Sequence, residues 1–287
     1  MATAECDITL PDGRTVHVYD SGDGGNAGMP TVYWHHGSPQ VGVPPEPLVA
    51  AGGGTVRWLS HDRPGYGGSD PHHGRSVAAV AADVACVADA LGVDRFAVMG
   101  QSGGGPHALA CAGVLEGRVL GAVCVSGLAP FDAAGLDWFA AMGDAGAAEF
   151  RAAARGRAAL QEHFAAGARI DESMFAPADM AAFSGAYGPW LISSVARAMD
   201  GDLDAYLDDF AAFTAPWGFD IDITVPVLFV HGAQDLFVPA EHSRWMARHC
   251  RRGELWLTPD DGHLSIFDHA ERAVTWLLDH TEDRPAR

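Results

Sequence analysis

Short apolar runs recur along the chain and alternate with longer stretches in which apolar residues are spaced three to four apart. The short runs predict buried strands at Asp7–Leu10, Thr15–Asp20, Thr31–His35, Val56–His61, Phe96–Gly100, Leu120–Ser126, Val227–His231 and Glu254–Leu257. The wider spacing predicts helices at Ser76–Leu91, Gly104–Leu115, Glu241–His249 and Leu264–His280. Strands interleaved with helices predict an α/β fold, with a mostly parallel sheet covered on both faces.

This alternation stops between Pro130 and Pro216. The segment is rich in alanine and aromatic residues at helical spacing and contains no strand pattern. Strands resume only at Val227. The sequence therefore predicts a core of residues 1–129 and 217–287, with residues 130–216 inserted as a helical cap in the position of a lid.

Composition narrows the class of protein. A chain of 287 residues with 48% hydrophobic residues is long enough for one large domain. Its formal net charge is −19 and it has no lysine, which disfavours nucleic acid and anionic membranes as partners. The first residues lack a signal-peptide pattern, and no window is apolar enough to span a bilayer. We expect a cytoplasmic monomer or homodimer that acts on a small molecule.

The five cysteines are scattered along the chain, mostly in apolar surroundings, at Cys6, Cys86, Cys111, Cys124 and Cys250. Their odd number and wide spacing favour buried, reduced thiols over a disulfide framework, and no spacing suggests zinc. The adjacent pairs His35-His36 and His72-His73 have no carboxylate or cysteine at metal-ligand spacing. Walker-type and dinucleotide-binding glycine loops are absent from the sequence. We expect no metal and no cofactor.

A single serine stands among glycines where one predicted strand ends and a helix begins. The sequence there is Gly100-Gln101-Ser102-Gly103-Gly104, which matches the G-x-S-x-G nucleophile elbow. Small residues in such a turn let strand and helix approach closely and leave the serine hydroxyl exposed. A lone match of this kind also occurs in glycine-rich turns that only pack a helix on a strand, so partners for Ser102 have to be found.

Two later strand ends supply these partners. Asp235 follows the strand that ends at His231, and His263 follows the strand that ends at Leu257. Side chains at the carboxyl edge of a parallel sheet can converge. A histidine would take the serine proton, and an acid would fix the histidine tautomer. Asp132, after the sixth strand, is a second candidate for the acid, but Asp235 is closer to its strand.

An oxyanion formed on the substrate needs two N–H donors, one from the residue after the nucleophile and one from the loop after the third strand. The backbone of Gly103 offers the first. The strand Thr31–His35 runs into His36-Gly37-Ser38-Pro39, and the amide of Ser38 is the candidate for the second. The alternative is that this loop is only a strand-ending turn.

Several motifs in chain order resemble those of the α/β-hydrolase superfamily, near its proline iminopeptidase-like and esterase branches. They are HHGSP, DRPGYGGSD, GQSGGG, HGAQDLFVP and DDGHLSIF. The resemblance implies an eight-stranded, mostly parallel sheet and a triad of Ser102, Asp235 and His263 beneath a helical cap. Haloalkane dehalogenases and epoxide hydrolases of this superfamily carry aspartate at the nucleophile position, where this chain has Ser102.

The loop Gly37-Ser38-Pro39-Gln40 departs from the His-Gly-Gly-Pro-Gly pattern of iminopeptidases. Those enzymes also hold the substrate amino terminus with cap carboxylates, for which Glu149, Glu162 and Glu172 are the candidates here. We therefore expect hydrolysis of a small to medium apolar ester or lactone through an acyl-enzyme on Ser102. The alternatives are an iminopeptidase-like aminopeptidase, a C–C bond hydrolase or an acyltransferase of the same fold, and a receptor-like binding protein with slow turnover.

Overall fold

The computed structural model describes residues 3–22, 28–168 and 172–281. Its strands form one eight-stranded sheet in the order β1-β2-β4-β3-β5-β6-β7-β8. Strand β2 is antiparallel to both of its neighbours, β1 and β4. All other neighbouring strands in this order are parallel. The strands are β1 (Ala4–Thr9), β2 (Thr15–Asp20), β3 (Thr31–His35), β4 (Arg57–His61), β5 (Phe96–Gln101), β6 (Val119–Val125), β7 (Val227–Gly232) and β8 (Gly253–Thr258).

Helices cover both faces of this sheet. The α-helices are α1 (Glu46–Ala51), α2 (Val80–Ala90), α3 (Gly104–Val114), α4 (Asp144–Ala154), α5 (Arg157–Ala165), α6 (Pro177–Ala182), α7 (Gly188–Ala198), α8 (Asp204–Thr214), α9 (Glu241–His249) and α10 (Ala270–Thr281), and the short 3-10 helices are η1 (Val77–Ala79), η2 (Glu172–Met174) and η3 (Ser265–His269). Successive strand residues point to opposite faces. Tyr33 and Val98 therefore belong to the core on the face covered by α2, α3 and α9, whereas Trp34 and Met99 belong to the core on the face covered by α1 and α10.

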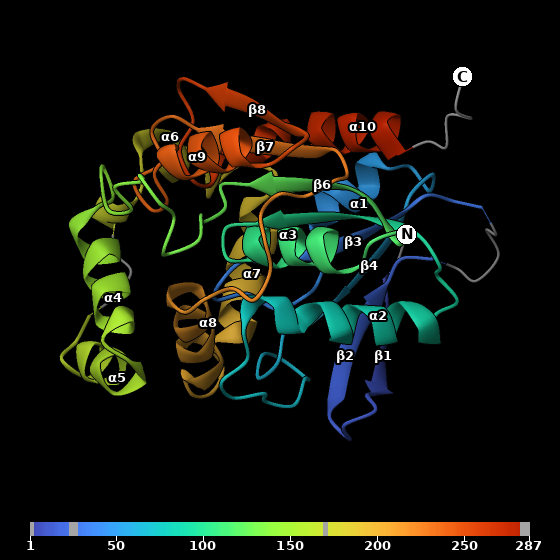
Figure 1. The fold of residues 1–287 in the computed structure, drawn as a ribbon, viewed down its shortest axis with the longest axis horizontal. Coiled ribbons are helices and arrows are strands. Elements are labelled where there is room, and N and C mark those ends of the chain that lie inside the picture. The colour runs from blue at the N-terminus through green and yellow to red at the C-terminus, as the bar shows by residue number, and fades with distance from the viewer. Residues whose placement is uncertain (1–2, 23–27, 169–171, 282–287) are drawn as a thin grey trace.

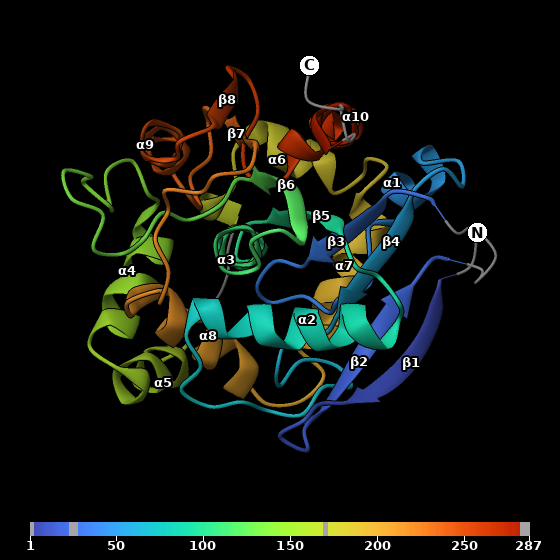
Figure 2. The same cartoon turned by 45° about the vertical axis from the view of Figure 1, so that its right-hand side comes forward.

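Between β6 and β7 the described residues form helices only, namely α4 to α8 with η2, which we call the inserted helices. Figures 1 and 2 both show α4 and α5 at the left of the molecule with α8 beside them, beyond the ends toward which the arrows of the parallel strands point. In an open parallel sheet, ligands bind outside this carboxyl edge. The inserted helices therefore lie on the side of the sheet where a site is expected.

The structure confirms the predicted α/β fold and all eight predicted strands, with ends that differ by a few residues. The four predicted helices are also present, and two of them begin as the 3-10 turns η1 and η3. Helix α1 was not predicted from the sequence, because it is only six residues long. The cysteines are free thiols; Cys111, Cys124 and Cys250 are buried as expected, but Cys6 is exposed because the edge strand β1 is mostly exposed.

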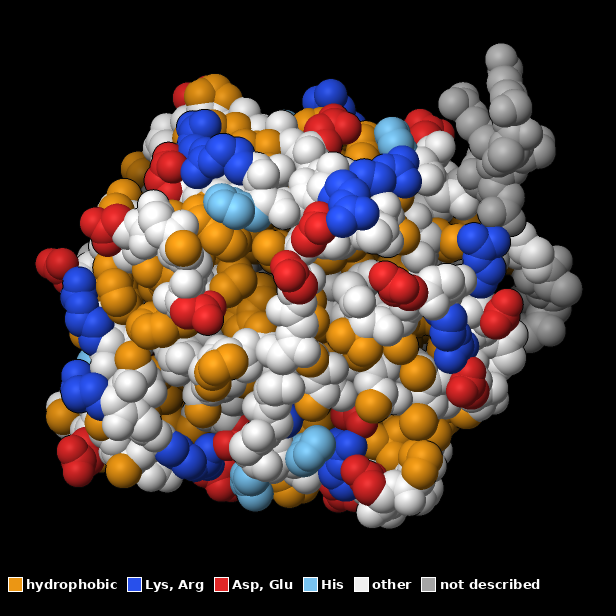
Figure 3. Space-filling view, in the orientation of Figure 1, with side chains coloured by type: hydrophobic (Ala, Val, Ile, Leu, Met, Phe, Trp, Pro, Cys, Tyr) orange, Lys and Arg blue, Asp and Glu red, His pale blue; other side chains and the backbone are white. Residues whose placement is uncertain are grey.

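Within the described ranges no helix is both long and apolar enough to cross a membrane. Acidic and basic side chains are interspersed on the face shown in Figure 3, and hydrophobic side chains gather toward its left side, where Figure 1 shows the inserted helices. The surplus of acidic residues therefore does not form one continuous patch on this face.

Candidate active site

Ser102 occupies the sharp turn between β5 and α3. Its φ of 52° lies in the left-handed region, which residues other than glycine rarely adopt. The Ser102 N–H donates to the carbonyl of Val125 at 2.9 Å, which ties the turn to β6. A Cβ at Gly104 would clash with the carbonyl of His35, so only glycine lets α3 start this close to β3. The glycines around Ser102 thus permit a turn that presents its side chain.

His263 and Asp235 form a buried pair. Nδ1 of His263 lies 2.7 Å from Oδ2 of Asp235, and the other carboxylate oxygen accepts hydrogen bonds from the N–H groups of Phe237 and Val238, both at 2.8 Å. Burial opposes the imidazolium, but the Asp235 carboxylate holds the pKa of His263 above its ordinary value. His263 in turn keeps the pKa of Asp235 low despite its burial. The pair therefore favours Nδ1–H on the neutral ring and stabilises the cation.

Two further polar groups contact this pair. Nε2 of His231, at the end of β7, lies 3.2 Å from Oδ2 of Asp235. The carboxamide nitrogen of Gln101 lies 3.4 Å from Nε2 of His263. The hydrogen bonds found for the described residues include none between Ser102 and His263. Without a bound substrate, the distance between a nucleophile and its base is often too long for a hydrogen bond, and it shortens when the substrate binds.

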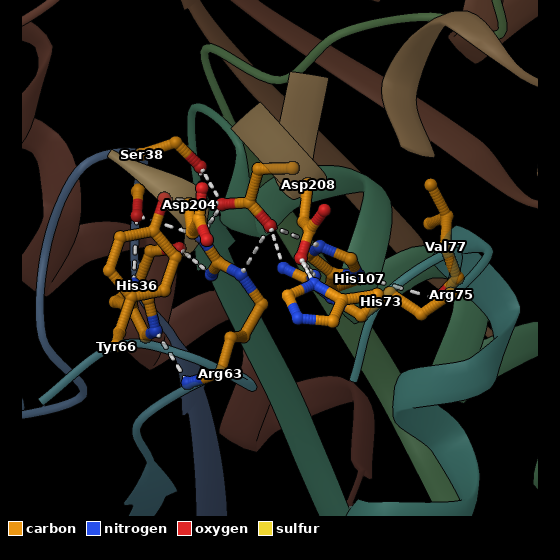
Figure 4. A network of polar contacts seen from close by, with 12 residues as sticks. His36, Ser38, Arg63, Tyr66, His73, Arg75, Val77, His107, Asp204 and Asp208 are labelled. Carbon is orange, nitrogen blue, oxygen red and sulfur yellow. Dashed lines mark hydrogen bonds and ion pairs between the residues drawn. The ribbon is translucent and has the colours of Figure 1, made fainter. Parts of the chain in front are cut away.

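The loop after β3 is held by a buried ionic network (Figure 4). The Ser38 hydroxyl donates to Oδ2 of Asp209 on α8 and accepts from Nη2 of Arg63 at 2.9 Å. Asp209 also binds Arg75, at 2.6 Å, and the hydroxyl of Tyr66, at 3.0 Å. Burial alone would raise the pKa of Asp209, but Arg63 and Arg75 hold it well below its ordinary value. The network joins an inserted helix to the loop.

Ser38 and Gly103 lie next to each other, so close that a Cβ built at Gly103 would clash with the Ser38 side chain. In the described part of the chain, neither backbone N–H of these two residues has a hydrogen-bond acceptor. Two unpaired donors therefore stand beside Ser102.

One cavity of about 390 Å³ joins these groups. Among the described residues that line it, nine are apolar and none is Asp, Glu or Arg. The inserted helices and the turn before α6 contribute Phe175, Phe183, Leu191, Ile192, Val195 and Ala196; the remaining lining residues are Ser38, Pro39, Gln40, Gln101, Ser102, Phe237, His263 and Leu264. Ser102, Ser38 and His263, which are candidates from the sequence, all line this cavity, but the aromatic side chains that line it could not be identified from helical spacing.

A model of the alpha/beta hydrolase fold matches residues 30–270, which is most of the chain. The protein belongs to this family. No curated protein matches its sequence significantly.

Solved structures with the same fold include the enol-lactonase from Burkholderia xenovorans LB400, at 20% identity and a TM-score of 0.70, covering 96% of this chain and 99% of that chain. A thermophilic esterase from Thermogutta terrifontis has 21% identity and a TM-score of 0.68, with coverages of 97% and 99%. An epoxide hydrolase from hot-environment metagenomes has 20% identity and a TM-score of 0.66, with coverages of 97% and 99%. The fold is shared by different chemistries, so function has to be argued from the site.

Two of the carboxylates considered for an amino terminus, Glu149 and Glu162, do not line the cavity of this α/β hydrolase. Glu149 is 1% exposed on α4, beside the hydroxyl of Tyr206 at 3.4 Å, and Glu162 is exposed on α5. The side chain of Glu172 lies outside the described residues. Asp132, the second candidate acid, is exposed and does not contact His263, whereas Asp235 does.

Burial raises the pKa of Glu149 from 4.5 to about 7. Between pH 4.5 and about 7, the folded protein keeps a proton on Glu149 that the unfolded chain has lost. The contribution of Glu149 to the free energy of unfolding is therefore fully present below pH 4.5 and is lost as the pH rises through about 7. We expect Glu149→Gln to raise the free energy of unfolding at pH 8 by roughly 2–3 kcal/mol and to change it little at pH 4.5. Thermal unfolding across this pH range measures the difference.

Glu162→Gln is the matched control, because it makes the same change at an exposed site of the inserted helices. Its difference from the wild type should not depend on pH. If the Glu149→Gln difference were equally flat, folding would not raise the pKa of Glu149.

The described residues contain no group of three or more His, Cys, Asp or Glu side chains placed to hold a metal ion. The adjacent histidines have other contacts: Nε2 of His36 accepts the N–H of Arg63 at 2.9 Å, and His73 lies 2.8 Å from Asp208. These contacts assign His36 and His73 to packing and to the polar network of this α/β hydrolase.

Proposed function

We propose that the protein is a serine hydrolase that cleaves a small to medium, neutral and apolar ester or lactone. The observation that carries the proposal is a strained, half-buried Ser102 that lines the same apolar cavity as His263, whose Nδ1 is bonded to Asp235. A serine hydroxyl becomes a useful nucleophile when a base with a fixed tautomer takes its proton.

In the proposed reaction, Ser102 Oγ attacks the carbonyl carbon while Nε2 of His263 accepts the hydroxyl proton. The imidazolium is stabilised by Asp235 and then protonates the leaving alcohol as the acyl-enzyme forms. Water attacks the acyl-enzyme with His263 again as the base, and Ser102 is released. Every proton transfer uses Nε2, because Nδ1 stays bonded to Asp235. The steps use only side chains, backbone groups and water.

The backbone N–H groups of Ser38 and Gly103 are the proposed oxyanion hole. They are adjacent, and neither has an acceptor within the described residues. The Ser38 hydroxyl is already bonded to Asp209 and Arg63, so its part is to anchor the loop. Donors fixed before the reaction stabilise developing charge without reorganisation.

Residues 130–216 form the proposed cap over the core of residues 1–129 and 217–287. Their helices supply Phe183, Leu191 and Val195 to the cavity. Most of the described lining residues are apolar and none is Asp, Glu or Arg, so a neutral acyl or alcohol group is favoured over an ionised one. The described lining also offers no carboxylate to bind an amino terminus.

A substrate panel tests this assignment. We expect p-nitrophenyl butyrate and neutral lactones to be hydrolysed with a higher kcat/KM than p-nitrophenyl succinate or proline p-nitroanilide. Ala196→Arg, at an exposed position that lines the cavity, should raise kcat/KM for the anionic succinate ester by about fivefold, the effect of roughly 1 kcal/mol of Coulomb attraction.

Ser193→Arg is the matched control, since it places the same charge on an exposed residue of α7 that does not line the cavity. It should leave the preference for neutral esters unchanged. Faster cleavage of proline p-nitroanilide than of every ester would contradict the proposed substrate class.

A further inference from the structure

The carboxylate of Asp179, on α6 of the inserted helices, is fully buried against the loop that carries His263. One oxygen accepts the N–H of His263 at 2.9 Å, and the other accepts the N–H groups of Leu264 at 2.7 Å and Ser265 at 2.9 Å. The Ser265 hydroxyl adds a fourth contact at 3.2 Å. One side chain of α6 thus binds three consecutive peptide groups beginning at His263.

All the donors found for this carboxylate in the described structure are N–H or O–H groups, and none belongs to a charged side chain. The three loop N–H groups lie at the start of η3, which continues directly into α10, and the unpaired backbone donors at such a start favour a negative charge. The carboxylate therefore takes the place of a helix cap but comes from a distant segment.

Gly262 is shaped by the same contact. A Cβ at this position would clash with the Asp179 carboxylate, and the nearest atoms it would meet all belong to that side chain. The φ of Gly262 is not in the left-handed region, so its own backbone conformation would accept alanine. The glycine in the Asp261-Gly262-His263 segment is required by the approach of Asp179.

We propose that Asp179 is a positioning residue for His263, through which docking of α6 sets the geometry of the base. The proposal rests on the proposed function, in which His263 transfers the protons. Asp179 holds the backbone of His263 while Asp235 holds its ring, and Phe237 stacks on the ring with centroids 5.1 Å apart. Because the backbone and the ring of His263 are both held, the side chain keeps one rotamer, in which Nε2 points into the cavity.

Asp179 also affects the charge of the base. Burial opposes the imidazolium and lowers the pKa of His263, whereas the carboxylate of Asp235 raises it. The negative charge of Asp179 raises this pKa further. His231 contacts the same Asp235 oxygen, while Phe237 and Gln101 beside the ring are uncharged. Removing the Asp179 charge should therefore lower the pKa of His263.

Asp179→Asn tests the proposal with a nearly isosteric change. We expect kcat for p-nitrophenyl butyrate to fall by about ten- to a hundredfold, the size of effect that a small misplacement of a catalytic group produces. KM should change little, because Asp179 does not line the cavity. The acidic limb of the kcat/KM profile should move to lower pH, which a loss of stability alone would not cause.

Asp83→Asn is the matched control. Asp83 is a buried carboxylate on α2 that accepts hydrogen bonds from the Arg14 guanidinium at 2.7 and 3.1 Å and does not contact the His263 loop. Its substitution should lower Tm but leave kcat and the pH profile unchanged. A wild-type kcat and profile in Asp179→Asn, or the same pH shift in Asp83→Asn, would overturn the proposal.

Gly262→Ala provides a second route if Asp179→Asn folds poorly. The added methyl group should displace the carboxylate and reduce kcat, but it should cost little more in an Asp179→Ala background, where the clash is gone. This dependence is measured as a double-mutant cycle. Independent, additive losses would show that Gly262 and Asp179 do not act through their contact.

The NMR titration of His263 separates this proposal from the proposed function. In a Ser102→Ala background, the His263 pKa should be lower with Asp179→Asn than without it, whether or not the wild type hydrolyses esters. An inactive wild type with this pKa difference would refute the hydrolase assignment but retain the contact. An active wild type without the difference would refute the role of Asp179.

Discussion

Ser102→Ala should abolish labelling by a fluorophosphonate probe and lower kcat for p-nitrophenyl butyrate by about 10⁴-fold or more, because the acyl-enzyme cannot form without the hydroxyl. The protein should remain folded, since alanine is smaller and the turn is held by backbone hydrogen bonds to Val125 and within α3. Mass mapping of the labelled wild-type protein should place the probe on Ser102.

Ser126→Ala is the matched control for this substitution. Ser126 stands at the end of the neighbouring strand β6, also with a positive φ, of 46°, but it does not line the cavity. Its alanine variant should label and hydrolyse as the wild type does. Labelling that persists in Ser102→Ala, together with hydrolysis at the wild-type rate, would show that another residue is the nucleophile.

The sequence predicted the centre of the sheet well because β3, β5, β6 and β7 are short apolar runs buried on both faces and bounded by turns. Thr31–His35, for example, has all five residues buried, and its predicted ends match β3. The positions of Ser102, Asp235 and His263 could also be predicted, since each follows a strand and carboxyl ends of parallel strands share one edge. Local pattern and topology together were sufficient for these residues.

The contacts made by the inserted helices could not be predicted in this way. Asp179 meets a loop more than eighty residues later, and Asp209 meets Ser38 across an even longer separation. Helical spacing shows that a segment has an apolar face, but it does not say which element this face meets. An acidic residue in a helix usually faces solvent, so a fully buried one such as Asp179 has no distinct sequence signal.

Asp235→Asn should lower kcat by about 10⁴-fold near neutral pH, since it reverses the polarity of one hydrogen bond. The carboxamide oxygen can keep the N–H groups of Phe237 and Val238, which leaves the NH₂ group facing Nδ1 of His263. The imidazole must then carry its proton on Nε2, where it can no longer accept one from Ser102. The measurement is kcat for p-nitrophenyl butyrate, with a folding control by circular dichroism.

Asp132→Asn makes the same chemical change at the other candidate acid. Asp132 is exposed and does not contact His263, so its substitution should change kcat by less than about tenfold. The fixed tautomer, rather than the number of nearby carboxylates, would then account for the difference between the two variants. A large loss confined to Asp132→Asn would mean that the chain rearranges around substrate to bring the loop after β6 against His263, and the acid would have to be reassigned.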